Sequence, residues 1–335
     1  MRIAVDAMGG DYAPEEIIKG VLQVASSIQG QILLVGRKEA IEKYLPSPTQ
    51  NIAIIPATDV IEMHDSPVES VLKKKDSSLL KAVYMVRDGT ADALVTAGNT
   101  GAAAAACHII LRCLPRINRP AIATTFPSKK DRFVVLDSGA TPDADVRNLL
   151  EFAVMGSAYA ETVLGKKEPR IGLLNIGEEA TKGNILTKEA YKLLSKNLPN
   201  FAGNVEGKDI FEGNFDVVVC DGFVGNVLLK TAQGCAEWIK ELIQNSFPRN
   251  PILKLIAYRI LKPGLSRMMK SIDYAEIGGA PLLGVNGLCV IAHGRSRAKA
   301  IRNAIMLVQN EYKGHLNELI KERIQHLQTE QAGAI

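Results

Sequence analysis

The sequence predicts an α/β protein whose mostly parallel sheet carries helices on both faces. Short runs of β-branched residues and leucine recur along the chain, and each is followed by a polar or glycine-rich turn and a helix-like stretch. The runs are continuously apolar, which is typical of strands buried on both faces. No repeat or long linker divides the chain. We therefore expect a single catalytic domain over residues 1–328, in one lobe or in two around a cleft, and a frayed tail at 329–335.

The expected elements follow from the spacing of the apolar residues. Predicted strands are Arg2–Val5, Gln31–Val35, Asn51–Ile55, Ala93–Thr96, Phe133–Leu136, Arg170–Leu174, Asp216–Cys220 and Leu288–Ala292. Apolar residues recurring at intervals of three and four predict helices at Pro14–Ser27, Ala144–Val163, Lys188–Leu194, Gly225–Phe247 and Arg295–Tyr312, the last running on towards Gln328.

Composition narrows the class of protein. A chain of 335 residues that is 47% hydrophobic can bury a large core. Its five cysteines are odd in number and widely spaced, as in a protein of the reducing cytoplasm. The chain opens on a strand pattern rather than a signal peptide, and no apolar run is long enough for a spanning helix. Aromatics are 5% and do not alternate with basic residues, so we expect no nucleic-acid partner.

Glycine-rich loops follow six of the predicted strands, where ligands collect in open α/β sheets. The clearest is Ala97–Gly101, because the alanine run after it favours a helix whose first N–H groups can bind phosphate. A tight turn needed only for packing is the alternative. The predicted phosphate- and substrate-binding residues are Asp6, Gly9, Gly10, Asp11, Gly98, Asn99, Thr100, Gly101, Asp137, Gly139, Gly177, Glu178, Asp221, Gly222 and Gly225.

Several kinds of chemistry lack their usual motifs. The dinucleotide and phosphate-loop fingerprints are absent, and so are the nucleophile elbow and any His/Cys pair with metal-ligand spacing. We therefore expect no metal and no cofactor. The remaining backbone and amide donors suit acyl transfer, in which negative charge develops on an oxygen.

Three residues are candidates for catalysis. Lys182 lies in a glycine-flanked loop where a cation can neutralise phosphate, with pairing to Glu178 or Glu179 as the alternative. Asn226 can donate to a thioester oxygen, whereas its neighbour Asp221 can simply cap the turn. His293 ends a buried strand and can move a proton, unless it is a structural histidine.

The segment from 248 to 272 differs from the rest of the chain. Between Glu241 and Asp273 there is no acidic residue but there are six basic ones. Apolar residues at helical spacing lie on both sides of Pro263-Gly264, which predicts a basic amphipathic helix hairpin. Such a hairpin can lie on an anionic membrane, or its apolar faces can pack at a dimer interface or on the core. The predicted membrane-contacting residues are Leu255, Ile256, Ile260, Leu265, Met268 and Met269.

Five motifs in chain order resemble one family. They are Val5–Asp11, Thr96–Ala102, Asn175–Glu179, Asp221–Asn226 and Gly279–Gly284, and the similarity runs from residue 1 to about residue 315. The family is the bacterial acyl-acyl-carrier-protein:phosphate acyltransferase, PlsX, of phospholipid synthesis. The resemblance implies a homodimeric, Rossmann-like three-layer α/β/α fold akin to phosphotransacetylase and isopropylmalate dehydrogenase. It also implies that inorganic phosphate attacks the thioester of a long-chain acyl-acyl carrier protein, giving an acyl phosphate for a membrane acyltransferase.

Within that resemblance the candidate residues acquire expected roles. Gly98–Gly101 and Lys182 are expected to hold phosphate, while Asn226 and His293 serve the thioester oxygen or the departing thiolate. Acyl carrier protein is acidic, so a basic face is expected to dock it. Arg295, Arg297, Lys299 and Arg302 form one candidate cluster, and Lys73–Lys75 form another, each with a solvated surface as the alternative. The competing functions are a phosphotransacetylase-like enzyme using short acyl-CoA and a non-catalytic membrane scaffold.

Overall fold

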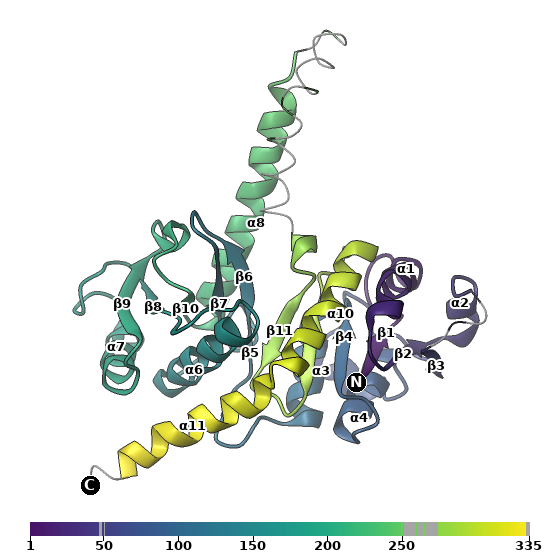
Figure 1. Cartoon of the computed structure of the whole chain (residues 1–335), viewed down its shortest axis with the longest axis horizontal. Coiled ribbons are helices and arrows are strands. Elements are labelled where there is room, and N and C mark those ends of the chain that lie inside the picture. Colours follow the sequence, from purple (N-terminus) through teal and green to yellow (C-terminus); the bar gives the residue numbers. More distant parts are fainter. Residues whose placement is uncertain are drawn as a thin grey trace.

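The strands form two sheets that lie side by side (Figure 1). The computed structural model describes residues 1–332 except 47, 48, 50, 249, 251–258, 260, 262, 263 and 265–273. The first sheet has the order β3-β2-β1-β4-β12-β11-β5 and the second the order β6-β7-β10-β8-β9. The strand bounds are β1 Arg2–Asp6, β2 Gln31–Gly36, β3 Ile52–Pro56, β4 Ala93–Thr96, β5 Ala121–Ile122, β6 Thr124–Pro127, β7 Arg132–Leu136, β8 Ile171–Asn175, β9 Phe201–Glu206, β10 Val217–Val219, β11 Ala280–Leu283 and β12 Leu288–Ile291.

Most strand pairs are parallel, which confirms the predicted α/β class. In the first sheet only β11 and β5 run antiparallel to their neighbours, and in the second only β6 does. The described helices between the strands are α1 Glu15–Val24, α2 Lys38–Glu42, α3 Pro67–Lys73, α4 Ser78–Arg87, α5 Thr100–Ala106, α6 Val146–Thr162, α7 Ile185–Asn197 and α8 Gly222–Asn245. Helices α10 Ala298–Lys313 and α11 Leu316–Ala332 follow the last strand.

One hydrophobic cluster takes in residues from both sheets. It contains Ile3 of β1, Leu136 of β7 and Val217 of β10, all at most 1% exposed. Helix α6 packs into the same cluster through Phe152 and Tyr159. Because these side chains share one buried volume, the two sheets are held together by apolar burial as well as by the chain connections.

The structure contains elements that the apolar pattern did not predict. Strands β5, β6, β9 and β11 are short or interrupted by polar residues, proline or glycine, so they lack the continuous apolar run. Helices α2, α3 and α4 were also not predicted. The predicted C-terminal helix is two helices, α10 and α11, because the chain turns at Gly314 and His315, where φ of His315 is +49°. Helix α11 continues to Ala332, inside the segment expected as a tail.

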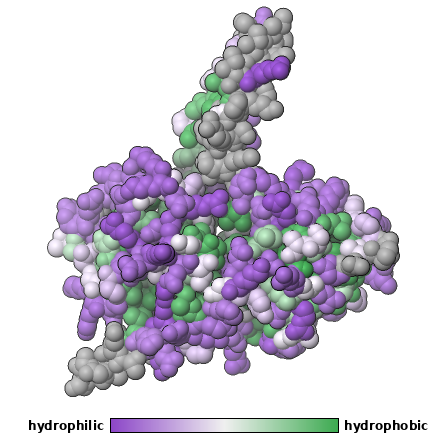
Figure 2. All heavy atoms as spheres, viewed as in Figure 1, coloured by the Kyte–Doolittle hydropathy of each residue, from purple (hydrophilic) through white to green (hydrophobic). Residues whose placement is uncertain are grey.

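Helix α8 extends away from the sheets (Figure 1). Of its residues only Gly222 and Gly225 are buried. Figure 2 shows apolar surface on this projecting helix, and Phe223, Val227, Trp238, Ile239 and Leu242 are exposed there. The predicted membrane-contacting residues Leu255, Ile256, Ile260, Leu265, Met268 and Met269 lie outside the described residues. Among the described helices, none is long and apolar enough to cross a membrane.

Glu311 of α10 leads to a prediction about stability and pH. The side chain is 1% exposed, its Oε1 has no hydrogen-bond partner in the described part of the chain, and burial raises its pKa well above the usual range. A raised folded-state pKa means that the free energy of unfolding falls as pH rises from the unfolded value, about 4.3, through the folded one. Glu311→Gln is therefore expected to raise the thermal midpoint at pH 8 and to change it much less at pH 4. An equal effect at both pH values would contradict this explanation.

Candidate active site

The loops after β1, β4 and β12 meet at one edge of the first sheet, because these strands are parallel neighbours. Asp6 ends β1 and is 2% exposed. The Thr96 hydroxyl donates to Asp6 Oδ2 at 2.8 Å, and the Gly98 N–H donates to Thr96 Oγ1 at 3.0 Å. Burial raises the pKa of Asp6, whereas hydrogen bonds from Ser78 and Thr96 lower it. Asp6 therefore orients the start of the 98–101 loop through Thr96.

The Gly9–Asp11 turn packs tightly on the neighbouring loops. A Cβ on Gly9 would lie 2.6 Å from Asp6 Oδ2 and 2.7 Å from the Gly98 nitrogen, so a side chain cannot fit there. The Asp11 N–H donates to the Gly294 carbonyl at 2.8 Å. Gly10 lies between the carbonyls of Ala97 and Gly294. The predicted residues of these three loops thus form one compact group.

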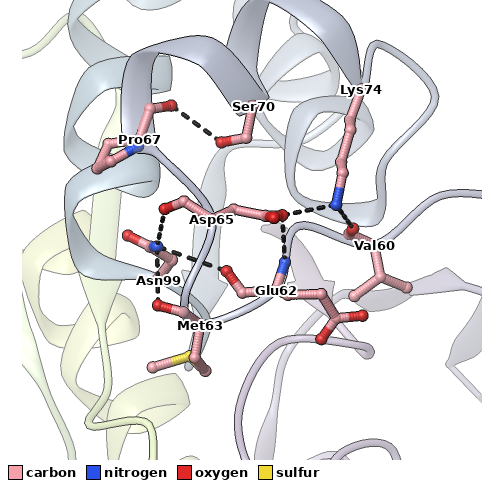
Figure 3. A network of polar contacts seen from close by, with 8 residues as sticks. All are labelled: Val60, Glu62, Met63, Asp65, Pro67, Ser70, Lys74 and Asn99. Atoms are coloured by element: carbon pink, nitrogen blue, oxygen red, sulfur yellow. Dashed lines mark hydrogen bonds and ion pairs between the residues drawn. The ribbon is translucent and has the colours of Figure 1, made fainter.

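Asn99 connects the start of α5 to the loop before α3 (Figure 3). Its Oδ1 accepts from the Ala102 N–H at 3.0 Å, which caps α5. Its Nδ2 donates to the carbonyls of Met63 and Asp65 at 3.1 and 3.0 Å. Lys74 donates to Asp65 Oδ2 at 2.6 Å and holds the same loop from the other side. The Asn99 side chain is therefore engaged in structure, which leaves Thr100 and Gly101 as the exposed residues of this loop.

His293 follows β12 and is half-buried. Its Nδ1 accepts the Arg295 N–H at 3.1 Å, so the neutral ring carries its proton on Nε2. Burial lowers the pKa of His293, and the charges of Lys230 and Arg295 lower it further, while Asp11 opposes them. Since Lys230 belongs to α8, the helix from the second sheet passes close to the edge of the first. The neutral ring of His293 has a single N–H donor, at Nε2.

Asp137, at the end of β7, joins the two sheets. Its fully buried carboxylate accepts backbone N–H groups from Ile122, Gly139, Ala140 and Thr141 at 2.5 to 3.0 Å. Ile122 is in β5 of the first sheet, whereas the other three form the loop after β7. Burial raises the pKa of Asp137, and these four donors lower it. The N–H of Gly139 therefore donates to Asp137 and is not available to a ligand.

Helix α8 begins against this Asp137 loop. Asp221 Oδ1 accepts the Val224 N–H at 2.9 Å, so Asp221 caps the helix, which was the structural alternative for this residue. Gly222 and Gly225 pack on Asp137 itself. Asn226 is exposed beside Gly139, where an added Cβ would lie 3.5 Å from the Asn226 side chain. The structure thus brings Asn226 next to the 137–141 loop.

Lys182 lies in the loop after β8, with Gly177 and Glu178. Asn175 Nδ2 donates to the Lys182 carbonyl at 3.2 Å and closes the loop, and Gly177 packs on the Lys182 stem. Glu178 and the Lys182 side chain are exposed. Within the described residues the Lys182 ammonium forms no ion pair, so the alternative pairing with Glu178 or Glu179 is not observed. No hydrogen bond of the described chain joins Lys182 to the 98–101 loop.

A cavity of about 210 Å³ lies where the two groups of loops approach each other. Thr100 and Gly101 line it from the first sheet, and Gly139 lines it from the second. His108 and Arg119 complete its polar wall, and neither was predicted as a site residue. The available signal was weak: no acidic residue occurs from 93 to 130, a region that includes both. Lys182, Asn226 and His293 are not part of this wall.

The predicted docking clusters are partly engaged in internal contacts. Arg297 lies over the Tyr12 ring at 4.4 Å, and Lys299 pairs with Glu276 at 2.8 Å. Arg302 donates to its neighbour Asn303, whereas Arg295 is exposed. In the other cluster, Lys73 pairs with Glu69 and Lys74 with Asp65. The ion pairs of Lys73 and Lys299 are solvent-exposed, so either lysine could leave its present carboxylate for one on a docked protein at a small cost in free energy.

Comparison with known proteins identifies the family. The model of a family described as "Fatty acid synthesis protein" matches residues 1–315. A phosphate acyltransferase of Desulfitobacterium hafniense is 50% identical, covering 96% of this chain and 97% of its own. One of Halothermothrix orenii is 48% identical, covering 97% and 98%. The chain belongs to the PlsX family of phosphate acyltransferases. Membership confirms the predicted family and the prediction of an acyltransferase enzyme.

Solved structures resemble this PlsX-family chain in fold. A phosphotransacetylase from Streptococcus pyogenes superimposes with a TM-score of 0.62 at 18% identity, covering 93% of this chain and 94% of its own. A branched-chain phosphotransacylase from Enterococcus faecalis gives a TM-score of 0.56 at 13% identity, covering 93% and 98%. At these identities the likeness shows a shared fold, as the resemblance to phosphotransacetylase implied.

Proposed function

We propose that this PlsX-family chain transfers a long-chain acyl group from acyl carrier protein to inorganic phosphate, in the cytoplasm, for phospholipid synthesis. A phosphate oxygen forms a bond to the thioester carbon, and the carbon–sulfur bond then breaks. The products are acyl phosphate and the carrier thiol, whose thiolate takes up a proton. The observation that carries the proposal is family membership over nearly the whole chain. No metal or cofactor enters this reaction.

The site residues support direct attack by phosphate. Phosphate is already partly dianionic near neutral pH, so the enzyme needs to position it and stabilise the oxyanion rather than supply a strong base. We assign phosphate binding to the 98–101 loop, through its exposed residues Thr100 and Gly101, and to Lys182. We assign the thioester oxygen or departing thiolate to Asn226 and His293. A covalent intermediate on Cys220 is disfavoured, because burial and neighbouring carboxylates raise its thiol pKa well above the usual range.

The donor test compares long-chain acyl-carrier protein, palmitoyl-CoA and acetyl-CoA at equal concentration, with thiol release measured with and without phosphate. The proposal predicts that acyl-carrier protein is the best donor and that release depends on phosphate. Preference for acetyl-CoA would favour a phosphotransacetylase-like enzyme instead. Membrane binding without phosphate-dependent thiol release would favour the scaffold.

The proposal also includes partners outside the reaction itself. The basic cluster from Arg295 to Arg302 is proposed to dock the acidic carrier protein, and the exposed apolar residues of α8 support a homodimer. Peripheral membrane association through 248–272 would deliver the poorly soluble product to a membrane acyltransferase. Binding to vesicles should rise with their anionic lipid content. Association with vesicles that does not depend on lipid charge would rule out this membrane role. Sedimentation analysis of the protein in solution would show whether it is a dimer.

A further inference from the structure

Arg119 is an exposed arginine at the wall of the cavity. It lines the 210 Å³ cavity, and within the described residues its guanidinium forms no hydrogen bond or ion pair. The carboxylate of Glu151, which binds the neighbouring residue Asn118, is otherwise engaged: it accepts from the N–H of Asn118 at 2.9 Å and from Arg147 at 3.0 Å. An exposed arginine at a cavity wall that has no counter-ion within the described residues can present its donors to a bound anion.

The surroundings of Arg119 add polar groups but no negative charge. His108 lines the same wall, and its Nδ1 lies 3.4 Å from Cys113 Sγ. Burial and the charge of Arg119 lower the pKa of His108, so the ring is neutral at neutral pH. The pKa of Cys113 is raised to about 11, mainly by burial, so its thiol is also neutral. The positive charge of Arg119 is therefore uncompensated by its side-chain neighbours.

The opposite wall limits what else can bind an anion. The N–H groups of Gly139, Ala140 and Thr141 all point to Asp137 and are not available. Thr100 and Gly101 face the cavity from the start of α5. The remaining walls are apolar, with Pro67 and Ile122 among them. Of the described residues that line the cavity, Arg119 is the one arginine or lysine, and it shares the wall with Thr100 and Gly101 of the loop that is proposed to hold phosphate.

We propose that Arg119 binds the phosphate group of the reaction, with His108 and Thr100 at the same wall. This inference rests on the proposed function, since it takes the anion to be inorganic phosphate rather than a phosphate ester of the acyl donor. The planar guanidinium can donate two parallel hydrogen bonds to a tetrahedral oxyanion, which a lysine cannot do.

The test measures equilibrium binding of inorganic phosphate by calorimetry to the full chain and three variants. Arg119→Gln is expected to raise the Kd about ten- to hundredfold, the range of hydrogen bonds to charged groups. Arg119→Lys is expected to recover part of this loss. Arg116→Gln is the matched control, because Arg116 is an exposed arginine of the same segment that does not line the cavity. Equal phosphate binding by Arg119→Gln and wild type, or an equal loss in Arg116→Gln, would overturn the proposal.

Kinetics separate this inference from the proposed function. In Arg119→Gln the KM for phosphate should rise while the KM for the acyl donor stays unchanged. A rise in the donor KM alone would place the donor rather than phosphate at Arg119 and overturn the inference. If phosphate binding depends on Arg119 but the wild type makes no acyl phosphate, the proposed function fails and the anion site stands.

Discussion

Gly225→Ala is expected to disrupt the junction between α8 and the Asp137 loop. A Cβ at position 225 would collide with the Asp137 carbonyl oxygen and lie 3.0 Å from Cys220 Sγ. Because backbone lies on one side of the new methyl group and a buried sulfur on the other, it cannot shift to avoid both. The free energy of unfolding should therefore fall by at least about 3 kcal/mol, the upper end of the usual cost of overpacking a core. Acyl transfer should be lost as well, because Asn226 moves with the start of α8.

Gly234→Ala on the same helix is the matched control. Nothing lies within 4 Å of a Cβ added at Gly234 in the described structure. Alanine in place of an exposed helical glycine should raise stability by about 1 kcal/mol. Denaturant unfolding of both variants provides the comparison. Wild-type stability in Gly225→Ala would show that α8 does not pack on Asp137 as described.

Lys182→Ala is expected to slow acyl phosphate formation about a hundredfold or more in a single turnover, the effect of removing one group that stabilises charge. The Lys182 side chain is exposed and forms no ion pair within the described residues, so its removal should leave folding unchanged. Lys188→Ala, an exposed lysine of α7, is the control and should react at the wild-type rate.

The same assay applied to His293→Ala separates the two proposed roles. If His293 serves the oxyanion or the thiolate, its loss should lower the rate at saturating phosphate. The loss of Lys182 should lower that rate and also raise the phosphate concentration that gives the half-maximal rate. A near-normal rate in either folded variant would remove that residue from the mechanism.

Local sequence predicted the strand-end loops because each combines an apolar run with glycine. Asp6–Asp11 and Ala97–Gly101 were found in this way, and the structure places them in contact. Asp137 was predicted as a ligand residue, but its acceptance of four N–H groups depends on a strand from the other sheet and is not visible in sequence. The division into two sheets was not predicted for the same reason, since strand order is a non-local property.

His108 and Arg119 were missed because neither lies in a motif. His108 is an isolated polar residue in an apolar stretch, and Arg119 is one of several basic residues between 112 and 119 with nothing to distinguish it. Only the approach of the second sheet turns their side of the chain into a cavity wall. The absence of acidic residues from 93 to 130 was the one signal available, and it resembles the signal at 248–272 that we interpreted as membrane binding. Charge asymmetry alone does not distinguish an anion site from a lipid surface.

The most direct test of phosphate as the nucleophile uses phosphate labelled with heavy oxygen at every position. The enzyme is incubated with long-chain acyl-carrier protein and the labelled phosphate, and the product is analysed by mass spectrometry. Direct attack predicts an acyl phosphate that keeps every heavy oxygen, formed in equal amount to the released carrier thiol. Release of free fatty acid that carries no heavy oxygen, at a rate independent of phosphate, would contradict the account.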